Sequence, residues 1–320
     1  MSGKEGEKSS LVSVLKDYKE SIQDWIDDRF VPPFERFALE KIYQNCEVRG
    51  VESRNLMFQI LMEQRELPGE ERLSFGVFFN HLGMADQVLV SWQVVEGYQE
   101  WLGEEVGSSG GSLLTDVVDV AWPMNQDFYG LRSIKYFPFA PPTRAVTRQM
   151  GFKATAVDTS GRTTAGYVDF LRSVKDVART GGVVIVAPEG TRSKTGGMQE
   201  VPPLMGKIAS MVDVVLLVGI TGTENIIPRN SRNPFQIRPS TPTTLTFGNL
   251  IDINALKEQL RERDGLKGRG NRKLYEGVKV SLMTGLAELL PEQYRGVWGG
   301  RVEEGEVARQ GQVAWSSLES

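Results

Sequence analysis

Two short, almost uninterrupted apolar runs, residues 183–187 and 214–220, constrain the fold of this 320-residue chain more than any other feature. Runs of this length and continuity are typical of strands that are covered on both faces of a sheet. Segments with helical periodicity lie between the strand-like runs. The helix predicted to begin near Thr164 ends before two glycines, Gly181 and Gly182, and its apolar face consists of Val168, Leu171, Val174, Val177 and Ala178. Strands that alternate with helices predict an α/β fold with a mainly parallel sheet flanked by helices.

The remaining patterns divide the chain into four regions. Further strands are predicted at residues 74–79, 154–157 and 244–247, and further helices at 53–64, 86–101, 203–211 and 271–290. We predict a disordered N-terminus over residues 1–10, an N-terminal helical pair within 11–45, an α/β domain with a C-terminal helix over 46–298, and a disordered tail over 299–320. The aromatic and proline-rich stretch 104–142 is ordinary core and loop, the wall of an apolar groove, or a surface that touches lipid.

Composition and charge exclude several classes of function. A net charge of −4 gives no basic excess for binding nucleic acid. With one cysteine, Cys46, and one histidine, the chain has neither an intrachain disulfide nor a usual set of zinc ligands, so we expect no metal site. No apolar run reaches the roughly 18–20 residues of a membrane-spanning helix, and no secretion or import signal is recognised. The expected location is cytoplasmic.

The only histidine, His81, lies between a predicted strand and a predicted helix, five residues before Asp86. Positions five apart point away from each other in an unbroken helix, but Asn80 and Gly83 predict a turn here. From the first turn of the helix, Asp86 can accept a proton from one ring nitrogen and leave the other as a base. The same residues also suit a structural turn histidine with a capping carboxylate, so the pair alone does not decide between catalysis and structure.

A second polar cluster follows the apolar run 183–187, with the sequence Pro188-Glu189-Gly190-Thr191-Arg192-Ser193-Lys194. The turn after a strand is where α/β proteins present ligand-binding groups. Here a glycine permits close approach of backbone, two hydroxyls can donate hydrogen bonds, and two cations can hold a phosphate. An exposed turn with two cations is also a common surface feature.

Together, the two clusters resemble the NHxxxxD and PEGTRS motifs of the glycerolipid acyltransferase family, which includes lysophosphatidic acid and glycerol-3-phosphate acyltransferases. The resemblance covers about residues 45–255. It implies that His81 deprotonates the acceptor hydroxyl, Asp86 orients the imidazole and Arg192 holds the acceptor phosphate. The substrate-binding positions that it implies are Asn80, Glu189, Gly190, Thr191, Arg192, Ser193, Lys194 and, from a loosely matched middle block over residues 151–162, Arg162. The later block of the family has a proline within a hydrophobic strand, which residues 214–220 lack.

The function implied by this resemblance is transfer of a fatty acyl group from acyl-CoA or acyl carrier protein to the hydroxyl of lysophosphatidate in glycerophospholipid synthesis. The alternatives are a glycerol-3-phosphate acyltransferase acting at the sn-1 position and a non-catalytic lipid-binding protein on the same fold. No cofactor is expected beyond the acyl thioester as co-substrate. The expected partners are lipid substrates, acyl carrier protein as one donor, and the membrane surface in a peripheral mode; nucleic acid is not expected.

Overall fold

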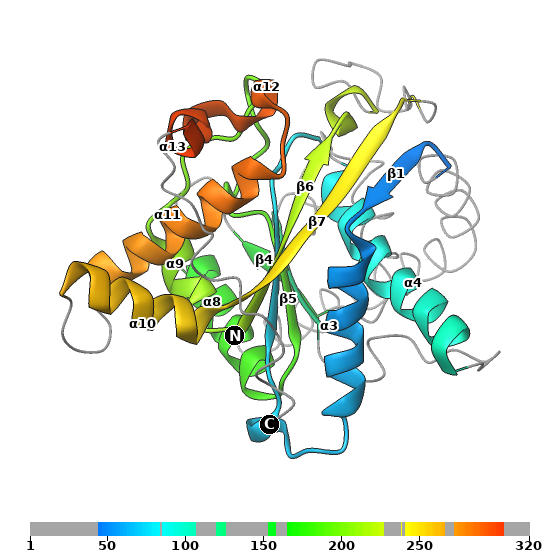
Figure 1. Cartoon of the computed structure of the whole chain (residues 1–320), viewed down its shortest axis with the longest axis vertical. Helices are drawn as coiled ribbons and strands as arrows, with labels where there is room; N and C mark the ends of the chain where they lie inside the picture. The colour runs from blue at the N-terminus through cyan, green and yellow to red at the C-terminus, as the bar shows by residue number, and fades with distance from the viewer. Residues whose placement is uncertain are drawn as a thin grey trace, which may run out of the picture.

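The computed structural model of the chain describes residues 44–83, 85–106, 120–125, 153–157, 165–226, 238, 241–265 and 272–303. Within these residues the molecule is an α/β sandwich with helices on both sides of one sheet, which confirms the predicted fold class (Figure 1). The predicted disordered N-terminus and almost all of the predicted N-terminal helical pair lie outside the described residues.

In the described part of the chain, the sheet has seven strands in the order β1-β7-β6-β2-β5-β3-β4. Strands β6, β2, β5, β3 and β4 run parallel to one another; β7 runs antiparallel to β6, and β1 is parallel to β7. The carboxyl ends of the five parallel strands therefore meet at one edge of the sheet. The strands are β1 (Cys46–Arg49), β2 (Phe75–Phe79), β3 (Val120–Asn125), β4 (Lys153–Val157), β5 (Val183–Val186), β6 (Val214–Thr221) and β7 (Thr243–Asp252).

Helices cover the two faces of the sheet. In Figure 1, α3 and α4 lie on one side of the sheet, while α8, α9, α10 and α11 lie on the other. The helices are α3 (Val51–Glu63), α4 (Asp86–Val106), α8 (Ala165–Arg179), α9 (Leu204–Ala209), α10 (Ile253–Asp264), α11 (Arg272–Glu288), α12 (Glu292–Arg295) and α13 (Gly299–Glu303). Short 3₁₀ turns are present at η1 (Gly69–Glu71), η3 (Thr223–Asn225) and η4 (Gly296–Trp298).

Alternation along β2 divides its side chains between two hydrophobic cores. Phe75, Val77 and Phe79 pack with α3 and α4, whereas Phe78 packs with the helices of the opposite face. All five residues of β2 are buried, so the strand lies within the core over its whole length. The carboxyl end of β2 carries the polar residues described below.

The structure corrects two of the predictions for individual elements. Val168, predicted on the apolar face of α8, is exposed, because Phe170, Val174 and Val177 define the buried side of this helix. The predicted disordered tail begins too early: its first residues form α13, next to the buried Trp298. The rest of the tail lies outside the described residues. The sequence patterns missed β1, β3 and α10.

No helix in the described ranges combines the length and the apolar character needed to cross a membrane.

Candidate active site

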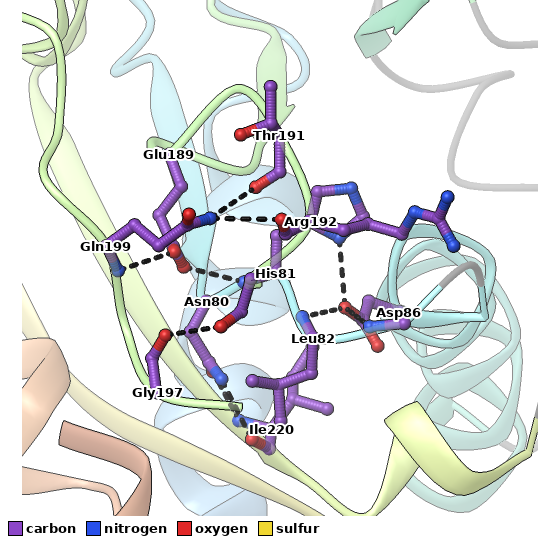
Figure 2. A network of polar contacts seen from close by, with 12 residues as sticks. Asn80, His81, Leu82, Asp86, Glu189, Thr191, Arg192, Gly197, Gln199 and Ile220 are labelled. Atoms are coloured by element: carbon purple, nitrogen blue, oxygen red, sulfur yellow. Dashed lines mark hydrogen bonds and ion pairs between the residues drawn. The ribbon is translucent and has the colours of Figure 1, made fainter. Parts of the chain in front are cut away.

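The site begins at Asn80, the residue that follows β2. Its buried side chain donates from Nδ2 to the carbonyl oxygen of Ile220 (2.9 Å), and its Oδ1 accepts from the backbone N–H of Ile220 (2.7 Å). A side-chain amide thus continues the pairing of β2 with β6 by one residue beyond the strand. This double hydrogen bond fixes the direction in which the chain leaves the sheet and enters the turn with His81 (Figure 2).

His81 and Asp86 are in contact across the turn between β2 and α4. The distance between His81 Nδ1 and Asp86 Oδ2 is 3.0 Å, which is a hydrogen-bonding distance. The His81 side chain is 18% exposed and that of Asp86 is fully buried. With Nδ1 directed at a carboxylate, the proton of a neutral imidazole is held at Nδ1, and Nε2 carries the free lone pair.

Asp86 also holds the backbone of the turn. Its Oδ2 accepts the backbone N–H groups of Leu82 (2.5 Å) and Gly83 (2.8 Å), because Asp86 is the first residue of α4 and the preceding chain folds over its carboxylate. Gly83 lies so close to the neighbouring chain that an added Cβ would be 2.6 Å from the carbonyl oxygen of Thr223. The turn therefore requires a residue without a side chain at position 83, and its backbone is fixed from two directions.

Glu189, which follows β5, is linked to this turn. Its Oε1 accepts the backbone N–H of His81 (2.9 Å), and its Oε2 accepts the backbone N–H of Gln199 (2.7 Å). Glu189 is only 5% exposed, and each of its carboxylate oxygens accepts a backbone N–H. Its side chain therefore organises the backbone at His81 and Gln199. It joins the turn with His81 to the loop after β5 at Gln199.

The rest of the loop is held by Ser193. The backbone N–H of Ser193 donates to the carbonyl oxygen of His81 (2.6 Å), so His81 contacts the loop through both of its backbone polar groups. The Ser193 hydroxyl donates to the carbonyl of Gly197 (2.6 Å) and accepts from the N–H of Gly196 (2.9 Å). Gly190 and Gly196 have positive φ angles of 66° and 89°, which explains the glycine at each position.

The cations and the remaining hydroxyl of the block lie nearer the surface. Thr191 and Lys194 are exposed and Arg192 is partly exposed. In Figure 2 the Arg192 side chain extends to the same side of the network as the His81 ring. The structure thus brings His81, Asp86 and residues 189–193 together at the carboxyl edge of the sheet.

Two parts of the site differ from the sequence-based list. Arg162, a substrate-binding position implied by the resemblance, lies outside the described residues. Gln199 and Trp298 were missed: the side-chain amide of Gln199 donates to the carbonyl oxygen of Arg192 (3.0 Å), and the Trp298 indole N–H donates to the carbonyl of Gln199 (3.0 Å). Neither residue belongs to a recognisable pattern, so only the structure could identify them.

A metal ion has no evident binding place in this part of the chain. Among the described residues, no three His, Cys, Asp or Glu side chains are grouped as metal ligands. The groups available for chemistry at this edge of the sheet are an imidazole, carboxylates, hydroxyls, a guanidinium and the ammonium of Lys194.

Burial raises the pKa of Glu189 from 4.5 to about 7, although the N–H groups of His81 and Gln199 act in the opposite direction. Between pH 4.5 and 7 the folded state keeps a proton that the unfolded state releases, so this group makes the protein less stable as pH rises through that range. A shift of this size corresponds to on the order of 3 kcal/mol. We expect the free energy of unfolding of the wild type, relative to Glu189→Gln, to fall by up to that amount between pH 5 and pH 8.

Urea unfolding at several pH values would measure this difference. Glu288→Gln, at an exposed position in α11, is the matched control for replacing a glutamate with a glutamine. Parallel curves for the wild type and Glu189→Gln would show that the buried carboxyl does not retain its proton.

Comparison with known proteins gives one named structural likeness. The chain is similar to a solved structure of the 1-acyl-sn-glycerophosphate (LPA) acyltransferase PlsC from Thermotoga maritima, with 18% sequence identity, a TM-score of 0.43, and coverage of 85% of this chain and 83% of that chain. No protein-family model matches the sequence, and no curated protein matches it.

Proposed function

We propose that the chain is a glycerolipid acyltransferase that transfers a fatty acyl group from acyl-CoA or acyl carrier protein to the hydroxyl of lysophosphatidate. The observation that supports this most directly is the contact of His81 Nδ1 with the buried Asp86, beside a loop that carries Arg192. The resemblance of these residues to the NHxxxxD and PEGTRS motifs suggests the substrate class.

The reaction requires a base at the acceptor hydroxyl. Nε2 of His81 takes the proton of the hydroxyl as its oxygen attacks the thioester carbonyl, and Asp86 stabilises the imidazolium that forms. Collapse of the tetrahedral intermediate breaks the carbon–sulfur bond, and the imidazolium returns the proton to the departing thiolate. The products are an ester and a free thiol, and the reaction consumes neither a metal nor a redox cofactor.

Arg192, with Thr191 and Lys194 nearby, is proposed to hold the phosphate of the acceptor. A guanidinium makes charge-assisted hydrogen bonds to phosphate oxygens, and such bonds contribute more to binding than neutral ones. The backbone of the loop is tied to His81 through Ser193, so a phosphate bound there would be held at a fixed place relative to the base.

Two measurements on the purified wild type test the proposal. Release of free thiol from acyl-CoA or acyl carrier protein, dependent on acceptor, separates acyl transfer from mere lipid binding. Mass spectrometry of the products made from lysophosphatidate and from glycerol-3-phosphate, offered together with one donor, identifies the acceptor. If no thiol is released with either acceptor and either donor, the proposed activity is wrong; acylation of glycerol-3-phosphate alone would assign the sn-1 reaction instead.

We expect Arg192→Ala to raise the KM for the phosphorylated acceptor about ten- to hundredfold while kcat changes little, because the change removes phosphate binding more than proton transfer. Steady-state kinetics with varied acceptor measure this. Arg172→Ala, which removes an exposed arginine paired with Asp169 on α8, is the matched control and should leave both constants unchanged. An equal loss of kcat with an unchanged KM would contradict the proposed role of Arg192.

A further inference from the structure

The C-terminal segment 292–303, which comprises α12, η4 and α13, is bonded directly to the end of the loop after β5. The backbone N–H of Met198 donates to the carbonyl of Tyr294 (2.9 Å), and the N–H of Val297 donates to the carbonyl of Met198 (3.2 Å). The Trp298 indole N–H donates to the carbonyl of Gln199 (3.0 Å), across 99 positions of sequence. Figure 1 shows α12 and α13 at the end of the sheet toward which β6 points, which is the edge with the candidate site.

The backbone of the C-terminal segment lies directly against the backbone of the loop after β5. Gly296 has a φ of 54°, and an added Cβ there would be 2.1 Å from the carbonyl oxygen of Met198. A Cβ on Gly197 would in turn be 2.8 Å from the Cα of Gly296. Trp298 is only 2% exposed, so its indole is fixed by packing as well as by its hydrogen bond. The C-terminal segment is thus closely packed against the end of the loop after β5.

Gln199 links the C-terminal segment to the candidate site through hydrogen bonds. Its backbone N–H donates to Glu189 Oε2 (2.7 Å), and the other oxygen of Glu189 accepts the N–H of His81. Its side-chain Nε2 donates to the carbonyl oxygens of Arg192 (3.0 Å) and Thr191 (3.5 Å). Three polar groups of Gln199, its backbone N–H, its carbonyl and its side-chain Nε2, therefore connect Trp298 with the carboxyl that holds the His81 backbone and with the backbone that carries Arg192. Figure 2 shows the bonds of Gln199 to Glu189, Thr191 and Arg192.

We propose that Gln199 is a positioning residue for binding of the phosphorylated acceptor, and that Trp298 in turn holds Gln199. This inference rests on the proposed function. Without the side-chain amide of Gln199, the backbone at Thr191 and Arg192 loses its hydrogen bonds to the segment that Trp298 supports. The acceptor must then order this backbone when it binds, and that cost reduces affinity. Proton transfer at His81 is spared, because the Glu189 bonds use only the backbone N–H of Gln199.

Two variants and one control test the proposal. Gln199→Met keeps the length of the side chain and the backbone N–H but removes the amide donor. Trp298→Phe keeps a buried aromatic ring but removes the indole N–H. Gln59→Met is the matched control, because Gln59 is an exposed glutamine on α3 whose amide donates to Glu63 of the same helix. Each protein is examined by steady-state kinetics with varied acceptor and by amide hydrogen exchange over residues 189–199.

We expect Gln199→Met to raise the KM for the acceptor about three- to tenfold, the effect of losing about one hydrogen bond, with kcat within about twofold of the wild type. Trp298→Phe should change KM in the same direction, both variants should speed amide exchange over 189–199, and Gln59→Met should do neither. Unchanged exchange in Gln199→Met, or an unchanged KM in an active protein, overturns the inference. If the wild type transfers no acyl group, the proposed function has failed, and hydrogen exchange alone then decides whether Gln199 holds the loop.

Discussion

His81→Ala is expected to lose about a hundred- to ten-thousandfold in kcat, the usual contribution of a general base, while the protein stays folded. Two contacts of His81 with the neighbouring loop use backbone atoms, the N–H bonded to Glu189 and the carbonyl bonded to Ser193, and alanine retains both. The imidazole contributes a contact with Asp86 and an edge-on contact with the Phe79 ring. The loss should therefore fall on the chemical step and not on the architecture of the turn.

Thiol release under single-turnover conditions would measure this loss, and circular dichroism would confirm that the variant is folded. The chain has no second histidine to serve as a matched control, but this has an advantage: every imidazole signal in a proton NMR spectrum belongs to His81. If His81 is the base, kcat/KM should fall toward acidic pH in step with the titration of those signals. Wild-type turnover in folded His81→Ala would exclude the mechanism.

Local sequence patterns predicted the elements that carry the site, because these patterns report burial. The apolar runs became β5 and β6, both inside the sheet, and the glycines after residue 180 mark the end of α8. The turn at His81 was predicted for the same kind of reason, since Asn80 and Gly83 interrupt an apolar strand. The side chain of Asn80 makes hydrogen bonds to backbone groups, and the backbone at Gly83 leaves no room for a side chain.

Elements with weak local signals were missed. Strand β1 alternates between partly buried and exposed residues and, within the described ranges, lies at the edge of the sheet next to β7, so its four residues show no apolar run. Helix α10 buries only Ile253, Leu256 and Leu260 among polar neighbours. The order of the strands and the antiparallel direction of β7 depend on pairing between distant segments, which local periodicity does not contain.

The same limit applied to the site. The turn predicted from Asn80 and Gly83 allowed His81 and Asp86, which are close in sequence, to meet. The contacts of Glu189 with His81 and of Trp298 with Gln199 join positions 108 and 99 residues apart. Their partners are backbone groups, which place no requirement on the residue type at the other end. Such contacts leave little trace in one sequence, even when they fix the geometry of the site.

Asp86→Asn is the change that best separates the charge of Asp86 from its structural role. Asparagine has the same shape, and its side-chain oxygen can take the place of Oδ2 and accept the N–H groups of Leu82 and Gly83 as well as His81 Nδ1. Its amide nitrogen would then occupy the place of Oδ1, which is buried and accepts no hydrogen bond within the described part of the chain. The turn can keep these bonds, and the negative charge beside the imidazole is lost.

We expect this variant to lose about a hundred- to ten-thousandfold in kcat, because the imidazolium formed during proton transfer is no longer stabilised by a buried carboxylate. The KM for the acceptor should change far less than kcat, since Asp86 is proposed to act on His81 and not on the phosphate. Asp169→Asn, an exposed aspartate on α8, is the matched control and should be fully active. If Asp86→Asn is folded and retains wild-type kcat, Asp86 serves only to hold the backbone of the turn at Leu82 and Gly83, and the imidazole of His81 is not activated by its neighbour.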